Sequence, residues 1–477
     1  MAHIQARIQC VLLLIATLFL SACTTIEKIS DLPIGAGFSA LDLCSRIFVS
    51  GEDEQLIIDK VISAKVFPLS YVWHLDINPN EQTVAVSAPF FPGLNTRTAV
   101  YRPGLGCTLA ITQTTEQIRS QAFIPFDNRQ INEIAPLATD LERTDKNEWL
   151  TDTVVGNLEA IIDSMFLENL DQDGFHQVNT FASLISYDGQ IIAERYEENH
   201  HGDMRMLSWS MAKTITSLIA GILYDQGRLK LDEPIPALSQ QGKTASIAQV
   251  MNMSSGLNWQ EGYKGTSDVS NMLYTEGNSA EYVAQRKQIS PAGRTYQYST
   301  GDTQLLAQVI SEKISPTLQG VYDFYQTQLF YKLGIYNGVI EHDESGTFLG
   351  GARVFLTPRD WLKIGQLIAN KGLWKLSEHG EERRIVSEKW IDFMSTPSPA
   401  SDYYGGQIWL NDMEAEFPEI PRDALFLRGH AGQFVGIVPS KKLVMTRLGA
   451  YGPKVEPSAY ARYFMLDMIK VLKQLPN

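Results

Sequence analysis

Strand-forming segments lie at both ends of residues 146–477 of this chain, and helix-forming segments lie between them. Near the start, two apolar strands meet at an Asp-Gly pair in "FASLISYDGQIIAERYE" (residues 181–197), a strong signal for a hairpin. Near the end come the strand-like runs "GQFVGIVPS" and "KLVMTRLGAY", followed by a helical pattern. This order predicts an α+β fold, in which an antiparallel β-sheet is flanked by helices and carries an inserted helical lobe.

The overall composition is that of a globular protein, with 44% hydrophobic and 20% charged residues among 477. Acidic residues outnumber basic ones by 54 to 40, which gives a net charge of −14. A surface this acidic repels phosphate backbones, so we expect no nucleic-acid partner.

The N-terminus has the pattern of an export signal. Arg7 precedes the apolar run "CVLLLIATLFL", which ends in Leu-Ser-Ala and Cys23. The run is about half as long as the ~20 residues of a membrane-spanning helix, and small residues follow it. This ending resembles a bacterial lipobox, which implies that residues 1–22 are a signal peptide and that Cys23 becomes lipidated. Because Thr24 rather than Asp follows, we expect a periplasmic protein anchored in the outer membrane. An uncleaved anchor is the alternative.

The chain has four cysteines, of which Cys44 and Cys107 remain once the signal and its cleavage site are set aside. In an oxidising compartment two such cysteines commonly pair, so we predict a disulfide between them. It would close a loop of about sixty residues and contribute on the order of 4 kcal/mol in a chain-entropy treatment. Two buried free thiols are the alternative.

Residues 23–145 contain strand-like runs separated by Gly, Pro and Asn turns, namely "RIFVSG", "QTVAVSA" and "TAVYRPGLGCTLAI". They contain no recognisable cluster of catalytic residue types. We therefore expect a small accessory β-rich segment, held by the disulfide, ahead of a main domain of residues 146–477.

The segment "RMLSWSMAKTITSLIAGIL" places Ser210 and Lys213 one turn apart at the head of an apolar helix. A serine hydroxyl is a poor nucleophile unless a base takes its proton, and residues i and i+3 share a helix face. To act as that base, Lys213 must be neutral. Burial or nearby positive charge must therefore lower its pKa from the solution value of ~10.4. The Ser-x-x-Lys pattern occurs once in the chain and predicts a nucleophile paired with its base.

A second segment, "SPAGRTYQYSTGDTQLLAQVI", places Tyr296 and Tyr298 in a loop before a helix that begins around Asp302. A tyrosine opposite a Ser/Lys pair can carry the proton between nucleophile and leaving group if positive charge lowers its pKa. The alternative is a half-buried aromatic ring with its hydroxyl in water.

A third segment, "RGHAGQFVGIVPSKKLVMTRLG", has His430, Ala431 and Gly432 at the expected start of a strand. We expect a strand edge whose backbone N–H groups face a substrate, with Gly432 allowing close approach. A purely structural role for His430 is the alternative.

In this order, the three segments resemble the serine β-lactamase and penicillin-binding-protein superfamily. In particular they resemble its class C-like branch, which includes esterases and 6-aminohexanoate-dimer hydrolases. Further matching phrases are "MNMSSGLNW", "GGARVFLTPRDWLKIGQL" and "YGGQIWLN". The resemblance implies that Ser210 is the acylated nucleophile, Lys213 its base partner and Tyr298 the catalytic tyrosine. The backbone N–H groups of Ser210 and Gln433 would then form the oxyanion hole.

Two departures from the family pattern bear on the substrate. Family β-lactamases carry Lys-Thr-Gly where this chain has His-Ala-Gly, and a mostly neutral histidine is a weaker partner for a carboxylate. A threonine also stands where the family usually has Asn, so the resemblance favours an uncharged ester or amide. The expected substrate-binding residues are Thr300, His430, Ala431, Gly432, Tyr263 and Trp409.

We therefore predict a lipid-anchored serine hydrolase that cleaves a small-molecule ester or amide through an acyl-enzyme, with no metal or organic cofactor. One alternative is a D,D-peptidase or β-lactamase acting on peptidoglycan-like substrates, which would turn over a chromogenic cephalosporin. The other is a cell-wall binding or sensor lipoprotein without turnover, which would form a stable adduct.

Overall fold

A computed structural model describes most of the chain beyond the N-terminal segment. The described residues are 31–63, 66, 73–87, 96–126, 130, 141, 143–144, 148–167, 178–263, 265–375, 382–411, 415–451 and 457–476. The predicted signal peptide, residues 1–22, and the predicted lipidation site, Cys23, lie outside them.

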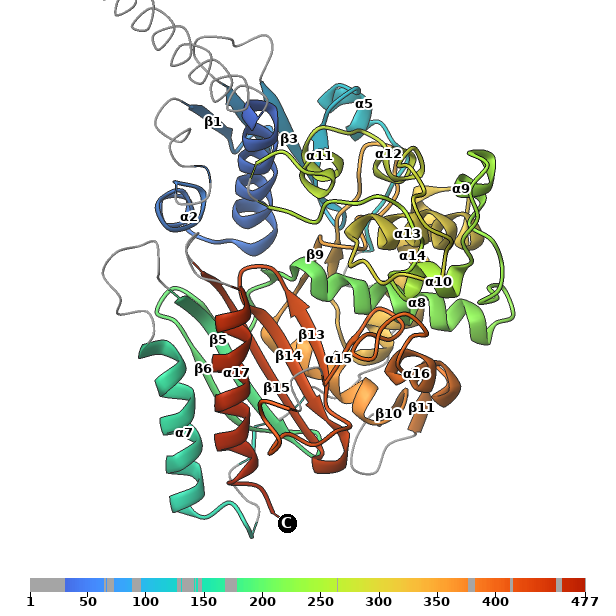
Figure 1. Ribbon diagram of the computed structural model, residues 1–477. Coiled ribbons are helices and arrows are strands. Elements are labelled where there is room, and N and C mark those ends of the chain that lie inside the picture. The colour runs from blue at the N-terminus through green and yellow to red at the C-terminus, as the bar shows by residue number, and fades with distance from the viewer. Residues whose placement is uncertain are drawn as a thin grey trace, which may run out of the picture.

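A six-stranded antiparallel sheet forms the centre of the molecule, in the order β12-β13-β14-β15-β5-β6 (Figure 1). Its longest pairing joins β15 to β5 and so brings the two ends of the main domain together. At the β5–β6 turn, Asp188 and Gly189 have φ of 49° and 80°, which confirms the predicted hairpin. The strands are β5 (Val178–Tyr187), β6 (Gln190–Tyr196), β12 (Trp409–Leu410), β13 (Leu425–Gly429), β14 (Gln433–Val438) and β15 (Leu443–Tyr451).

Helices cover both faces of this sheet. α7 (Asp152–Leu167) and α17 (Pro457–Leu472) pack on one face, and α15 (Pro358–Ala369) packs on the other (Figure 1). Successive strand residues alternate between the two cores, since Ile185 and Met445 face α7 and α17 whereas Leu184 and Val444 face the opposite side. The expected α+β architecture is confirmed.

A helical lobe is inserted between β6 and β12. α8 (Ala212–Asp225) crosses the lobe and is buried from Ala212 to Leu223, where other helices of the lobe, among them α13 (Thr300–Ile314) and α16 (Glu388–Ser395), pack against it. Further α-helices of the lobe are α9 (Pro236–Gln240), α10 (Ile247–Met251), α11 (Asp268–Tyr274), α12 (Ser279–Ala284) and α14 (Leu318–Tyr325). Short strands complete it: β7 (Met206–Leu207), β8 (Val339–Ile340), β9 (Val354–Leu356), β10 (Leu373–Lys375) and β11 (Glu382–Arg384).

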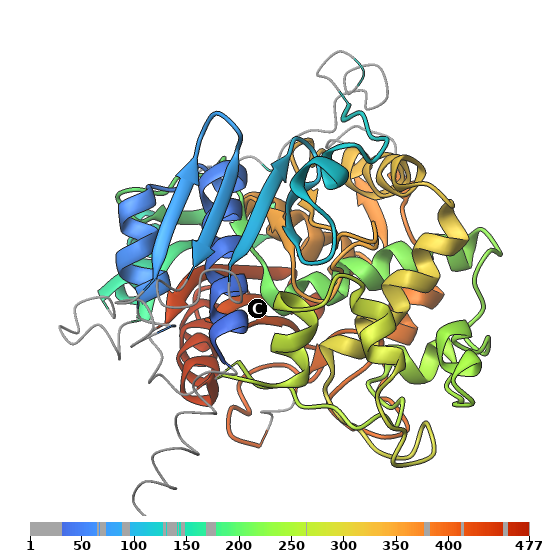
Figure 2. The ribbon, with the colours of Figure 1, turned by 90° about the horizontal axis from the view of Figure 1, so that it is seen from above.

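The N-terminal region contains the expected antiparallel strands but opens with a helix. β1 (His74–Asn78), β2 (Thr83–Ser87), β3 (Arg97–Arg102) and β4 (Gly106–Ala110) form a four-stranded sheet (Figure 2). Residues 31–50 form one helix that ends in the π-helical turn η1 (Arg46–Ser50), so the strand predicted for "RIFVSG" is wrong. Short helices follow the long helix and the sheet: α2 (Glu54–Ile57), η2 (Ile58–Ile62) and α5 (Thr115–Arg119).

Tertiary packing explains this long helix, which we call the N-terminal helix. A Cβ at Gly37 would lie 2.5 Å from the Tyr274 carbonyl oxygen, so the helix backbone packs directly on α11. Among the described residues, Asp31–Ser50 is the one helix long and apolar enough to cross a membrane, and 78% of its most apolar window is buried in the protein. We therefore treat it as a core helix.

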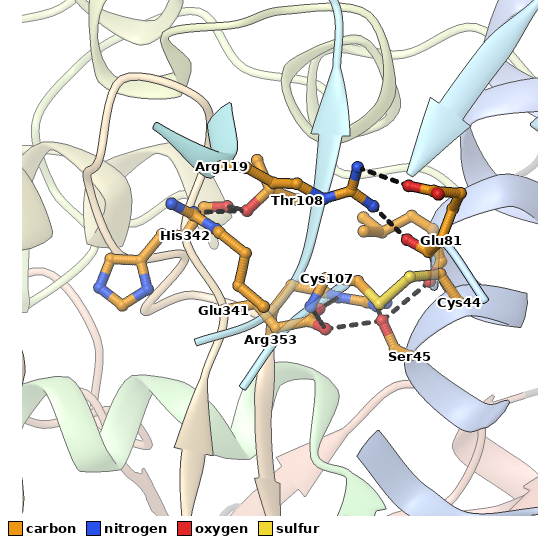
Figure 3. Close-up of a disulfide and its surroundings, with 11 residues drawn as sticks. Cys44, Ser45, Glu81, Cys107, Thr108, Arg119, Glu341, His342 and Arg353 are labelled. Carbon is orange, nitrogen blue, oxygen red and sulfur yellow. Dashed lines mark hydrogen bonds and ion pairs between the residues drawn. A yellow bond between two sulfur atoms is a disulfide. The ribbon is translucent and has the colours of Figure 1, made fainter. Parts of the chain in front are cut away.

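The predicted disulfide between Cys44 and Cys107 is confirmed, with Cα atoms 6.1 Å apart (Figure 3). Beside it lies a buried group that we call the junction cluster, made of Asp42, Ser45, Glu341 and Arg353. The guanidinium of Arg353 donates to Glu341 at 2.7 Å, to Asp42 at 2.8 Å and to Ser45 at 2.7 Å. The N-terminal region thus shares one hydrophobic core with the main domain, and the boundary at residue 146 stays a prediction.

Candidate active site

Ser210 lies in the 3-10 turn η5 (Trp209–Met211), which leads directly into α8. Its side chain is nearly buried, and it follows Trp209, whose φ of 48° is rare for a bulky residue. The Trp209 ring is held edge-on by Tyr263 at 5.5 Å and by His430 at 5.0 Å. Strained residues that the surrounding packing enforces are concentrated at functional sites.

Lys213 lies beside Ser210, as the sequence predicts. Its Nζ is 3.0 Å from Ser210 Oγ, 2.8 Å from Thr300 Oγ1 and 2.9 Å from the Gly351 carbonyl oxygen. All three partners are neutral. Burial lowers the pKa of Lys213 to about 8, while the Glu261 carboxylate partly opposes this shift. About one tenth of such a lysine is neutral at pH 7, which allows it to act as a base.

Tyr298 packs over the Ser/Lys pair. Its ring centre is 4.9 Å from Lys213 Nζ and stacks on Trp409 at 5.3 Å. Burial raises the pKa of Tyr298 well above its ordinary value, Glu261 adds to this, and a hydrogen bond with Ser210 opposes it. The condition that positive charge lowers this pKa is therefore not met, because desolvation and the Glu261 carboxylate raise it. Tyr298 is a phenol at neutral pH.

Thr300 lies between Lys213 and Glu261. Ser299 caps α13 by accepting from the Asp302 N–H at 2.9 Å, which fixes Thr300 in the first turn. Thr300 is fully buried there. Its hydroxyl accepts from Lys213 and donates to Glu261 at 2.5 Å. Thr300 thus positions Lys213, and its contact with substrate stays a prediction.

Glu261 is a site residue that the sequence analysis missed. Its carboxylate accepts from the Thr300 N–H at 2.8 Å, Trp259 Nε1 at 2.6 Å and the Tyr263 hydroxyl at 3.2 Å. A signal was present in "NWQEGY", where Trp259, Glu261 and Tyr263 alternate and can share one side of an extended segment.

The His-Ala-Gly segment is a turn between β13 and β14 rather than the start of a strand. Ala431 and Gly432 have φ of 61° and 87°. The His430 ring stacks on Tyr263 at 4.4 Å and so faces the pocket. Ala431 is buried, and a Cβ at Gly432 would lie 2.9 Å from the Tyr460 ring. Core packing and turn geometry account for both residues, and their roles in substrate binding stay predictions.

Two further predicted residues lie at this site. Gln433 is the first residue of β14, and its side-chain oxygen accepts from the Gly449 N–H at 3.1 Å. Its backbone role in the oxyanion hole stays a prediction. Trp409, from β12, lies between Tyr298 and Arg428, whose guanidinium carbon is 5.1 Å from the Trp409 ring centre. Trp409 thus supports Tyr298, and its contact with substrate stays a prediction.

Comparison with known proteins identifies the family of this chain. The family profile described as Beta-lactamase matches residues 167–467, which is more than half of the chain. The chain belongs to the Beta-lactamase family. The match spans η5, α8, the loop before α13 and the β13–β14 turn, which carry Ser210, Lys213, Tyr298 and His430 in that order.

Relatives within the Beta-lactamase family and its fold are distant. The 6-aminohexanoate-dimer hydrolase of Paenarthrobacter ureafaciens is 25% identical over 233 residues, covering 45% of this chain and 56% of that protein. The alignment thus spans little more than half the length of this curated relative.

Two solved structures share the fold. A Bacillus anthracis protein, provisionally assigned as a 6-aminohexanoate-dimer hydrolase, has a TM-score of 0.55 and 17% identity, covering 91% of this chain and 99% of that one. EstCE1, described as a hydrolase with promiscuous acyltransferase activity, has a TM-score of 0.50 and 12% identity, covering 66% and 98%. At these identities the likeness concerns the fold alone.

Proposed function

We propose that this Beta-lactamase family hydrolase cleaves an ester or amide bond through an acyl-enzyme on Ser210. One observation carries the proposal: Lys213 Nζ lies 3.0 Å from Ser210 Oγ in a buried site where every direct partner of the lysine is neutral. Such a lysine loses its proton at far lower pH than an exposed one, and it is placed to deprotonate the hydroxyl.

In the acylation step, Ser210 Oγ attacks the substrate carbonyl carbon as its proton passes to the neutral amine of Lys213. The carbonyl oxygen takes up the negative charge, and the N–H groups of Ser210 and Gln433 are proposed to stabilise it. The Tyr298 phenol then protonates the departing alcohol or amine and regains a proton from the Lys213 ammonium. A phenol with a raised pKa suits this role, because it keeps its proton until a strongly basic leaving group needs it.

In the deacylation step, water attacks the Ser210 ester and the proton transfers run in reverse. Lys213 and Tyr298 together relay one proton away from the attacking water. They then return one proton to Ser210 Oγ as the acyl group leaves. Free acid and the starting enzyme result, so the cycle consumes only water.

The proposed substrate is a small, uncharged ester or amide. His430 faces the pocket at the position where β-lactamases of the family carry a lysine, and it stacks on Tyr263. A stacked imidazole provides less positive charge for a substrate carboxylate than an ammonium group does. The sequence relative from Paenarthrobacter ureafaciens is named for a small-molecule substrate, which supports the small size. A 6-aminohexanoate dimer carries an amine and a carboxylate, so the proposal of an uncharged substrate rests on His430 and not on this relative.

The sharpest test is hydrolysis of p-nitrophenyl acetate by the full chain in detergent, compared with Ser210→Ala. We expect the substitution to lower the rate about 10³-fold or more, as expected for loss of a nucleophile. Ser217→Ala is the matched control, because Ser217 also lies on α8 and its hydroxyl donates to the Gly406 carbonyl at 2.9 Å rather than to the catalytic residues. Equal rates in wild type and Ser210→Ala would contradict the proposal, and turnover of a chromogenic cephalosporin would redirect it to a β-lactamase.

We also propose that the chain is a lipoprotein, anchored through Cys23 and facing the periplasm. The apolar run ahead of Cys23 and the disulfide between Cys44 and Cys107 support an exported protein. Radiolabelled palmitate should be incorporated by the wild type and not by Cys23→Ala. Equal labelling of both would contradict the assignment.

A further inference from the structure

A cavity of about 160 Å³ adjoins the candidate active site. One wall comes from the N-terminal helix through Ile34 and Phe38, and another from Trp209 and His430. Trp209, Tyr263 and His430 belong to both the cavity and the candidate active site, so the two share a boundary, although Ser210 itself does not line the cavity. The N-terminal region, which the sequence analysis left without a role, therefore forms part of the pocket.

The lining of this cavity is mainly aromatic. Rings from Phe38, Trp209, Tyr263, Tyr274 and His430 surround it, and Phe38 meets Tyr274 edge-on at 5.7 Å. Aromatic rings favour offset-stacked or edge-to-face contacts with another ring. A cavity of about 150 Å³ can hold a benzene molecule. Shape and lining therefore both favour a single aromatic ring as the occupant.

The wall from the N-terminal helix is fixed to the loop that carries the catalytic support residues. Asp31, which also lines the cavity, accepts through Oδ1 from the Thr266 N–H at 2.8 Å and from its hydroxyl at 2.6 Å. Gly265, with φ of 77°, lets the Asp31 carboxylate approach the loop backbone. The same loop carries Tyr263, whose hydroxyl donates to Glu261. The cavity is thus preformed beside the candidate active site.

We propose that this cavity is a substrate subsite that takes an aromatic ring next to the scissile ester or amide bond. The assignment rests on the proposed hydrolase function. The ring can belong to the acyl part or to the leaving group, and two substrate pairs distinguish these sources.

The kinetic test compares p-nitrophenyl phenylacetate with p-nitrophenyl acetate, and benzyl acetate with ethyl acetate, on the full chain in detergent. We expect the aromatic member of one pair to have the higher kcat/KM by about 10-fold or more. Ile34→Trp fills the cavity and should abolish this preference, while Ile47→Trp, on the same helix but outside the cavity lining, should retain it. Ser210-dependent turnover with the same ratio in Ile34→Trp would overturn the subsite.

A second substitution protects the test against misfolding of Ile34→Trp. If Ile34→Trp does not fold, Phe38→Ala replaces it, because it removes one of the lining rings and should lower the preference for the aromatic substrate. Phe48→Ala is its control on the same helix. An aromatic preference that Phe38→Ala leaves unchanged would overturn the subsite.

A binding measurement that needs no turnover distinguishes failure of the subsite from failure of the hydrolase function. Phenylacetamide should bind to Ser210→Ala in calorimetry, and binding should be lost when Ile34→Trp is added. This result supports the subsite even if no ester is turned over, in which case only the hydrolase function fails. Absence of phenylacetamide binding to Ser210→Ala would overturn the subsite.

Discussion

The junction cluster and the catalytic network are both buried networks of polar and charged groups. They differ in the groups that their cation contacts. In the junction cluster, Arg353 contacts the carboxylates of Glu341 and Asp42 directly, at 2.7 and 2.8 Å. In the catalytic network, Lys213 contacts two hydroxyls and a carbonyl, and Thr300 stands between it and Glu261. Both cations are almost fully buried.

The protonation of the two cations differs accordingly. Burial lowers the pKa of Arg353, but Glu341 and Asp42 more than offset this and raise it overall. Burial lowers the pKa of Lys213 to about 8, and Glu261, which Thr300 separates from the lysine, only partly opposes this. The arginine side chain, which keeps its proton, and the hydroxyl between Lys213 and Glu261 together distinguish the structural ion pair from a lysine that can act as a base.

The largest effect is expected from Lys213→Arg. Arginine keeps its charge at all accessible pH values, so Ser210 loses its base and kcat/KM for an ester should fall about 10²–10⁴-fold. Lys363→Arg is the matched control, because Lys363 is also buried in a helix but pairs directly with Asp360. Retained activity in Lys213→Arg would show that the lysine is not the base.

The next effect concerns the junction cluster. Arg353→Met leaves Glu341 buried without its cation and Asp42 with the longer 3.4 Å contact to Arg46, which should lower the free energy of unfolding by about 3–5 kcal/mol. Urea unfolding measures this change. Arg359→Met breaks a partly exposed pair with Glu194 and should cost only about 1 kcal/mol or less. Equal losses in the two variants would mean that the junction cluster does not behave as a buried ion pair.

Removing the disulfide should have a slightly smaller effect on stability. The bond closes a loop with a sequence separation of 63 residues, so Cys44→Ser with Cys107→Ser should cost about 2–4 kcal/mol. The same urea titration gives the value, with reduced wild type as a second measure. An unchanged unfolding midpoint would show that the hydrophobic core alone holds the N-terminal region in place.

The smallest effect is expected from Glu261→Gln, which keeps the shape and removes the charge. Glu261 raises the pKa of Lys213, so its neutralisation should lower that pKa further. Because the neutral lysine is the active form, the rising limb of kcat/KM against pH should move to lower pH, by about one unit or less. A shift to higher pH would contradict the electrostatic role given to Glu261.

Local patterns predicted the hairpin at Asp188, the helix that carries Ser210 and Lys213, and the pairing of Cys44 with Cys107. The hairpin and the helix depend on the spacing of residues, and the disulfide depends on the redox compartment that the export signal indicates. A single sequence contains both kinds of information. The N-terminal helix escaped prediction because its packing on Tyr274 overrides the strand-like composition of "RIFVSG".

The support of the catalytic lysine escaped prediction for a related reason. Glu261 reaches Thr300 across 39 residues of chain, and no periodic pattern records that contact. The same contact gives Thr300 a role in positioning Lys213 that the sequence did not indicate. Residues that touch one another only through the tertiary fold need the structure to reveal them.

The pH dependence of Ser210 acylation tests the central claim most directly. Stopped-flow release of p-nitrophenol from p-nitrophenyl acetate gives the acylation rate between pH 5 and pH 10, and peptide mass spectrometry locates the acetyl group. We expect the acetyl group on Ser210 and a rate that rises with a midpoint at about 8, set by Lys213. The rate should show no fall below about pH 10, because Tyr298 keeps its proton there. An acylation rate independent of pH, or an acetyl group on another residue, would contradict the account.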